Sequence, residues 1–162
     1  MTDNASDQPT LKARLRADLT AAMKARDTLT TGTLRLALAA ITTAEVSGST
    51  ARELTDAEVM TVLNKEVRKR AEAAEAFAGA GRAEQAAKEE AEAAVLTGYL
   101  PKPLTDDEIG VLVGAAVQDV ATSIGGPVTM RQMGQVIKQV QAAAAGRADG
   151  SRISAAVKAA LG

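Results

Sequence analysis

The amino-acid sequence predicts an all-α protein, with an N-terminal helical domain of about four helices followed by a small C-terminal three-helix module. Apolar residues recur at helical spacing along nearly the whole chain of 162 residues, and no segment is convincing as a strand. Glycines, prolines and capping patterns divide the chain into helix-length segments. Aromatic residues make up only 1%, so the core must be built from Leu, Val, Ile, Met and Ala.

Two apolar stripes mark the first two helices. The first is spaced by four residues and consists of Leu11, Leu15, Leu19 and Met23. Pro9 precedes this stripe and suits the first turn of a helix. The second stripe is Leu34, Leu38 and Ile41, and its helix should end before the loop-like sequence Ser-Gly-Ser-Thr at 47–50.

Capping signals bound the third and fourth helices. Thr55 followed by Glu58 is the capping-box pattern. The buried face that follows it is expected to be Val59, Val62, Leu63 and Val67. The glycines of Gly-Ala-Gly-Arg at 79–82 should end this helix. A fourth helix is expected from about 83 to 97, with Gly98 as its terminator.

The same capping pattern, Thr105 with Glu108, opens the C-terminal module. Gly-Gly-Pro at 125–127 should end the fifth helix, and the sequence at 146–151 should turn the chain between the last two. The apolar residues of these three helices are, in order, Ile109, Leu112, Val113, Val117 and Val120; Met133, Val136, Ile137 and Val140; and Ile153, Val157 and Leu161.

The sequence Tyr-Leu-Pro-Lys-Pro at 99–103 separates the two halves of the chain. Because Pro101 and Pro103 prevent a helix from continuing, this stretch predicts a stiff hinge. Tyr99 is expected to be buried against it, with its phenol bonded to a polar partner. The predicted division is a disordered tail over 1–10, a helical domain over 11–98 and a three-helix module over 99–162.

Composition excludes several classes of chemistry. The chain has no cysteine and no histidine, which removes disulfides, thiolate nucleophiles, imidazole bases and Cys/His zinc sites. It contains neither a P-loop nor a dinucleotide-binding glycine motif. We therefore expect no catalytic residue, no cofactor and no metal. No apolar run approaches the ~20 residues of a membrane span, and the polar N-terminus is unlike a signal peptide, so a cytoplasmic protein is expected.

The clusters of acidic residues have a structural explanation. Those at 56–58 and 106–108 lie in first turns, where carboxylates favour the helix dipole and bond to open N–H groups. Helical di-metal sites combine glutamates with histidines, which this chain lacks. A solvated acidic face is therefore expected at Glu89, Glu90 and Glu92.

The net charge of −1 hides local basic surfaces. The sequence at 64–70 packs four cations into about two turns: Lys65, Arg68, Lys69 and Arg70. Either a bound phosphate or the neighbouring glutamates would offset their repulsion. Other bases concentrate from 11 to 41 and after 120. Because Phe77 and Tyr99 are the only aromatic residues, stacking on single strands is disfavoured, and any bound RNA should be folded and contacted through its backbone.

Eight short motifs follow one another from about Leu11 to Leu161. They are "AMKARD" at 22–27, "LRLALAAI" at 34–41, "LTDAEV" at 54–59, "NKEVRKR" at 64–70, "AGRAEQAAKEEAE" at 80–92, "YLPKPLTDDEI" at 99–109, "MGQVIK" at 133–138 and "GRADGSRISAAVKAAL" at 146–161. In this order and spacing they resemble the GatB/YqeY family, in particular its stand-alone YqeY-like members. Phe77 departs from the family, which often has tyrosine there.

The resemblance implies an all-helical fold whose C-terminal module looks like the tail of the B subunit of tRNA-dependent amidotransferases. Those enzymes convert Glu or Asp, mischarged on tRNA, to Gln or Asn with glutamine as amide donor, and the tail helps to hold tRNA. The family is thus associated with carbon–nitrogen ligase activity. This sequence carries neither the ATP-using domain of that subunit nor an amidase-type serine machinery, so we lean toward a protein that is not an enzyme.

The function expected from this resemblance and from the basic residues is that of a non-catalytic, tRNA-associated accessory to tRNA-dependent amidation. The residues expected to contact RNA phosphates are Lys65, Arg68, Lys69, Arg70, Arg82, Arg131, Lys138, Arg147, Arg152 and Lys158. Two alternatives stay open. One is an adaptor that binds an amidotransferase or an aminoacyl-tRNA synthetase, and the other is an amidotransferase-type enzyme component.

Overall fold

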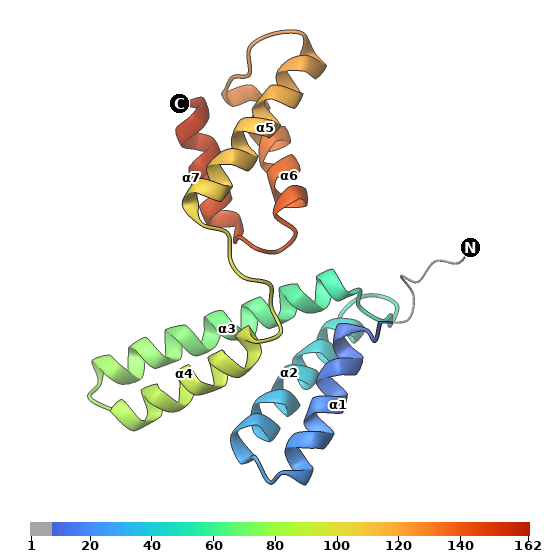
Figure 1. The fold of residues 1–162 in the computed structure, drawn as a ribbon, viewed down its shortest axis with the longest axis vertical. Coiled ribbons are helices and arrows are strands. Elements are labelled where there is room, and N and C mark those ends of the chain that lie inside the picture. Colours follow the sequence, from blue (N-terminus) through green and yellow to red (C-terminus); the bar gives the residue numbers. More distant parts are fainter. Residues whose placement is uncertain (1–7) are drawn as a thin grey trace. The chain divides into compact units, whose positions relative to one another are not determined.

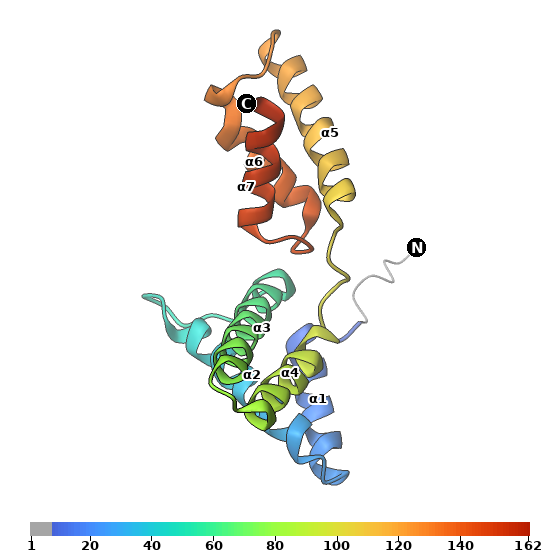
Figure 2. The ribbon, with the colours of Figure 1, turned by 90° about the vertical axis from the view of Figure 1, so that its left-hand side faces the viewer.

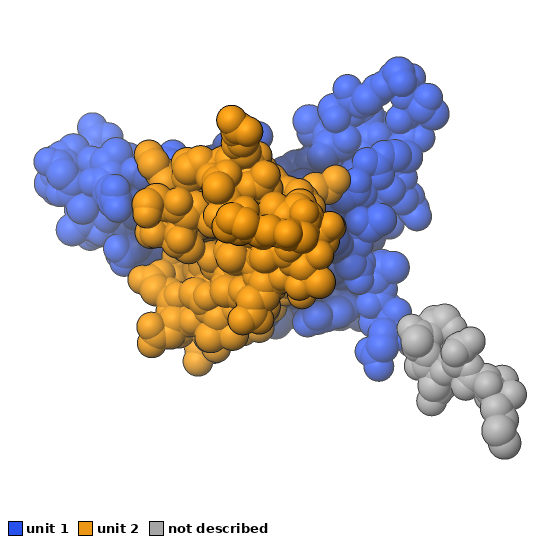
Figure 3. All heavy atoms as spheres, turned by 90° about the horizontal axis from the view of Figure 1, so that it is seen from above, with its two compact units in different colours: residues 1–100 blue, residues 101–162 orange. Residues whose placement is uncertain are grey.

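The computed structural model describes residues 8–162, and within them it contains seven α-helices, one short 3-10 helix and no strand (Figure 1). The all-α prediction is confirmed. The chain divides into two compact units, Met1–Leu100 (unit 1) and Pro101–Gly162 (unit 2), which Figure 3 distinguishes by colour. Most of the tail predicted over 1–10 lies outside the described residues. No helix within 8–162 has the length and apolarity needed to cross a lipid bilayer.

Unit 1 consists of two helical hairpins. α1 (Leu11–Lys24) packs against α2 (Thr28–Val46), and α3 (Asp56–Gly79) packs along α4 (Ala83–Thr97), as Figures 1 and 2 show. The hairpins share a core of aliphatic side chains, namely Leu11, Leu15, Leu34, Ala37, Ile41, Val59, Leu63 and Leu96. The apolar stripes of the sequence therefore face one another inside this unit.

Unit 2 is a three-helix bundle, visible in Figure 2. It contains α5 (Asp106–Ile124), the 3-10 helix η1 (Met130–Gln132), α6 (Met133–Ala144) and α7 (Gly150–Leu161). Its separate core is formed by Leu104, Ile109, Val113, Ala116, Val120, Val136, Val140, Ala144, Ile153 and Val157. Sequence reasoning missed η1, although Thr129 and Gln132 form a capping box at its start, and that spacing was the available signal.

The predicted capping boxes are both present. The Glu58 N–H donates to Thr55 Oγ1 at 3.2 Å, and the Thr55 N–H donates to Glu58 Oε2 at 2.8 Å. Thr105 and Glu108 repeat this arrangement at the start of α5 with the same two distances. Pro9 lies before the N-cap Thr10 rather than in the first turn, because the Thr10 hydroxyl already caps α1.

The boundary between the units falls two residues beyond the predicted one. Tyr99 and Leu100 pack against the core of unit 1 and therefore belong to it. On the side of unit 2, the Leu104 N–H donates to the Arg147 carbonyl at 2.7 Å, and Arg147 Nε donates to the Lys102 carbonyl at 2.9 Å. Of the expected hinge residues Tyr99, Pro101 and Pro103, only Pro101 lies between these two sets of contacts.

Candidate nucleic-acid interface

The basic run on α3 is divided between the surface and the interior. Lys65, Arg68 and Lys69 are exposed, whereas Arg70 is only 6% exposed. Val59 and Leu63 lie on the buried face of α3, and the same helical spacing carries that face onward to Arg70. Periodicity therefore turns Arg70 inward even though its neighbours in sequence face solvent.

Arg70 is the centre of an ion-pair network that joins α3 to α4. Its Nη1 lies 3.0 Å from Glu66 Oε2, and its Nε lies 3.2 Å from Glu92 Oε2. When the side chain alone is counted, Arg70 is 7% exposed, Glu66 is 11% exposed and Glu92 is 13% exposed. Lys69 and Lys88 extend the network to the surface, at 3.1 Å from Glu66 and 3.7 Å from Glu92.

This network keeps Glu66 in its ionised form. Burial alone would raise the pKa of Glu66, but hydrogen bonds from Arg70 and Lys69, with their positive charges, outweigh that effect and hold the pKa below its usual value. Arg70 is committed to two carboxylates inside unit 1, so we withdraw it from the expected RNA contacts.

The expected solvated acidic face also needs correction at Glu92, which is paired with Arg70, whereas Glu90 is exposed.

In unit 2, two of the expected cations serve the bundle itself. Arg152 Nη2 lies 2.6 Å from Asp106 Oδ1 and so links α7 to the start of α5. Arg147 holds the segment at 102–104 through its Nε and its carbonyl. Both side chains are half-buried. These contacts leave Arg131, Lys138 and Lys158 as exposed cations, each on a different element of unit 2.

The expected contact residues therefore do not form one continuous cluster. α3 brings together Lys65, Arg68 and Lys69, and Arg82 is exposed at the start of α4. Within residues 8–162, no carboxylate forms an ion pair with the exposed cations Lys65, Arg82, Arg131, Lys138 or Lys158. The charge of these five side chains is available to an anionic partner.

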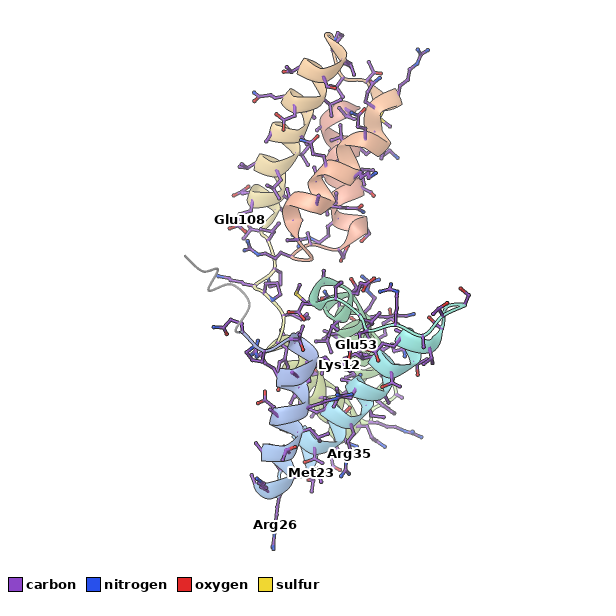
Figure 4. All side chains as sticks on the ribbon, turned by 90° about the vertical axis from the view of Figure 1, so that its right-hand side faces the viewer. Lys12, Met23, Arg26, Arg35, Glu53 and Glu108 are labelled. Atoms are coloured by element: carbon purple, nitrogen blue, oxygen red, sulfur yellow. The ribbon has the colours of Figure 1, made fainter. Side chains whose placement is uncertain are left out.

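A further group of cations, absent from the expected set, lies where α1 turns into α2. Lys24, Arg26 and Arg35 are exposed there, and Figure 4 shows Arg26 at the tip of the hairpin pointing away from it. Arg26 occupies the left-handed position after α1 with φ 58°, a position that usually holds glycine. The excess of basic residues over 11–41 was the feature of the sequence that could have predicted this group.

Other cations of that segment have internal partners. Lys12 Nζ lies 2.7 Å from Glu45 Oε1, and both side chains are nearly buried. The hydrogen bond from Lys12 holds the pKa of Glu45 below its usual value. The Arg14 guanidinium lies 5.6 Å from the centroid of the Tyr99 ring. The basic excess of α1 is thus partly structural.

Unit 2 also carries a shallow depression of about 280 Å³ between α5 and α6. Its lining is mostly apolar, with one charge of each sign: Leu104, Glu108, Val111, Leu112, Ala143 and Arg147. The Glu108 carboxylate is already engaged in the cap of α5. Across residues 8–162, acidic side chains do not gather in a group of three that could hold a metal ion.

The fold thus defines an all-helical protein of two compact units. The sequence matches the family model described as "Yqey-like protein" over residues 12–161, and the chain belongs to this family. It is also similar to an uncharacterized protein of Schizosaccharomyces pombe, with 37% identity over 99 residues. That alignment covers 61% of this chain and 79% of the yeast protein.

Proposed function

We propose that this protein is a non-catalytic, RNA-associated protein that contacts the phosphate backbone of folded RNA, and of tRNA in particular. The observation that supports this proposal most directly is the set of exposed cations without a carboxylate partner among the described residues. Lys65, Lys138 and Lys158 are representative of it. A cation already paired with a carboxylate gains less from a phosphate, because the existing pair must first be broken.

Two further arguments support backbone contact over base readout. The chain has one tyrosine and one phenylalanine, and Tyr99 is held against Asp18 and Arg14 within unit 1. Stacking platforms for single-stranded bases need several accessible aromatic rings. The role as an accessory to tRNA-dependent amidation depends on the resemblance of unit 2 to the amidotransferase tail.

The proposal is tested by measuring tRNA affinity over a salt series with two matched triple variants. A plot of the logarithm of the binding constant against the logarithm of the salt concentration has a negative slope. Replacing Lys65, Lys138 and Lys158 together by Ala should make that slope less steep by about one per cation. The control replaces Arg52, Lys69 and Lys88 by Ala; these are exposed cations that already have carboxylate partners. Because Lys69 is paired with Glu66, it is withdrawn from the expected RNA contacts together with Arg70. It removes the same net charge and should change the slope much less.

Two results would overturn the proposal. One is wild-type binding to tRNA that is no tighter than binding to an unrelated RNA duplex. The other is an equal loss of affinity in both triple variants, because that would make the effect one of net charge alone. Glutamine- and ATP-dependent amidation of mischarged tRNA by the isolated chain is expected to be undetectable, and turnover would favour the enzyme alternative.

The adaptor alternative is favoured by one observation. Val111, at the rim of the depression on unit 2, is 73% exposed, and Leu112 and Ala143 beside it add apolar surface. Pull-down from nuclease-treated lysate with wild type and Val111→Glu tests this alternative. A partner retained by wild type and lost by the variant would support it, and loss of every partner after nuclease treatment would count against it.

A further inference from the structure

The outward face of α2 is almost free of charge. It lies opposite the buried residues Leu34, Ala37 and Ile41, and its members recur at three- and four-residue spacing: Gly32, Leu36, Ala39, Thr43 and Val46. Leu36 is 57% exposed and Val46 is 59% exposed. A surface helix normally turns polar and charged residues toward solvent, as α1 does with Arg16 and Asp18. α2 is instead apolar on both faces.

Two details make this face suited to close packing against another helix. The Thr43 hydroxyl donates to the Ala39 carbonyl of the same helix at 3.0 Å, which satisfies its donor and leaves its methyl group as the apolar part of the face. A Cβ at Gly32 would meet no atom within 4 Å. Glycine costs helix stability relative to alanine, and nothing in the described chain requires it there. Because Gly32 has no side chain, it would let the backbone of a second helix approach closely at this point.

Charges of opposite sign lie near the two ends of α2. Lys24, Arg26 and Arg35 gather at the start of α2, where the Arg35 guanidinium contacts the Met23 sulfur at 3.7 Å instead of a carboxylate. Glu53 follows the end of α2, and its carboxylate has no cation partner within residues 8–162. Figure 4 labels Arg26, Arg35 and Glu53, with Arg26 at the hairpin tip and Glu53 away from it.

We propose that α2 packs antiparallel against α2 of a second copy of this chain, forming a two-fold symmetric dimer. Pairing centred on Ala39 places the start of each α2 beside the end of the other. Arg26 and its neighbouring cations then approach Glu53 of the second copy, and the symmetry repeats this attraction on both sides. The apolar faces of the two helices, with Leu36 and Val46, are buried between them.

A nucleic-acid occupant fits this face less well than a second copy. RNA phosphates attract Lys24, Arg26 and Arg35, but they gain nothing from Leu36 and Val46 along the rest of the helix. The dimer uses both the apolar face and the charges at its ends. It does not depend on RNA binding, and it is measured without RNA.

Sedimentation equilibrium over roughly two decades of concentration around the micromolar range tests the dimer. Wild type should show reversible dimerisation. Leu36→Glu with Val46→Glu should weaken it by roughly a hundredfold, because two apolar side chains per copy lose their burial. The matched control is Val111→Glu, which places the same charge on an exposed valine of unit 2 and should leave the dimer intact. Circular dichroism should show unchanged folding in every variant.

Charge exchange tests the register of the proposed pair. Arg26→Glu and Glu53→Lys should each weaken dimerisation, and the double variant should restore it, because each reversed charge then meets its reversed partner on the second copy. Three results would overturn the proposal: a wild type that remains monomeric, a dimer unaffected by the Leu36 and Val46 changes, and a double variant no better than the single ones.

Discussion

The hydroxyl of Tyr99 donates a hydrogen bond to Oδ2 of Asp18 over an oxygen–oxygen distance of 2.5 Å, across 81 residues of sequence. Arg14, one turn earlier on α1, places its guanidinium 5.6 Å from the centroid of the same ring. Tyr99 is therefore held on α1 by both its hydroxyl and its ring. The polar partner expected for its phenol is confirmed, and the contact attaches the end of α4 to the first helix of unit 1.

The ionisation of Tyr99 should report this contact directly. Burial and the hydrogen bond to Asp18 raise the pKa of Tyr99 above its usual value, and the nearby Arg14 opposes them only in part. Since Tyr99 is the only tyrosine, phenolate absorbance measured against pH follows it alone. Asp18→Asn should lower the pKa toward its usual value. Wild type titrating at the usual value while circular dichroism still shows a folded chain would contradict the contact.

Replacement of Arg70 by Ala should destabilise unit 1 by about 3 kcal/mol, because it leaves Glu66 and Glu92 as unpaired charges in a nearly buried position. The measurement is urea denaturation followed by circular dichroism. A triple variant, Arg70→Met with Glu66→Leu and Glu92→Leu, removes all three charges and should recover most of the loss. An Arg70→Ala variant as stable as wild type would show that the network contributes nothing to the pairing of α3 with α4.

Stability should decline as pH falls from 4.5 toward about 2, because Glu58 takes up a proton over this range. The Arg52 side chain and the Thr55 N–H lower the pKa of Glu58 from 4.5 to about 2. A lowered folded-state pKa means that the stabilisation is complete above 4.5 and is lost progressively as pH falls toward 2. Glu58→Gln should flatten this part of the stability profile, as followed by thermal melts at a series of pH values. A Glu58→Gln profile as steep as that of wild type would contradict this role of Glu58.

Glycine substitutions in α5 should act in opposite directions. Gly110 lies inside the helix, and a Cβ there would meet no atom within 4 Å. Gly110→Ala should therefore stabilise unit 2 by about 0.5–1 kcal/mol through helix propensity. Gly125 ends α5 at φ +67°, so Gly125→Ala should destabilise it by about 1 kcal/mol. Thermal melts of both variants check this, with Gly126→Ala as a control of ordinary φ. Equal effects of the substitutions at 110 and 125 would contradict the conclusion that Gly125, but not Gly110, is needed for its backbone conformation.

The candidate site was only partly accessible to sequence reasoning. The exposure of Lys65, Arg68 and Lys69 follows from a basic run on an amphipathic helix. The burial of Arg70 does not, because its second partner, Glu92, comes from the next helix, and only packing shows that the two side chains meet. The cations at the tip of the first hairpin were visible as a local excess of charge. To distinguish them from Lys12, which is paired inside unit 1, one must know the position of Glu45 in the structure.

The sequence by itself determined the helices, both capping boxes and the division near Tyr99. These features depend on interactions between residues no more than four positions apart, so spacing and residue type suffice to predict them. Only the tertiary structure decided which charges are used inside the molecule and which face solvent. Arg68 and Arg70 are two residues apart and lie on nearly opposite faces of α3, and the partner that makes burial of Arg70 possible belongs to α4. Such pairs form because two separate helices pack together, so the residue pattern within one helix does not predict them.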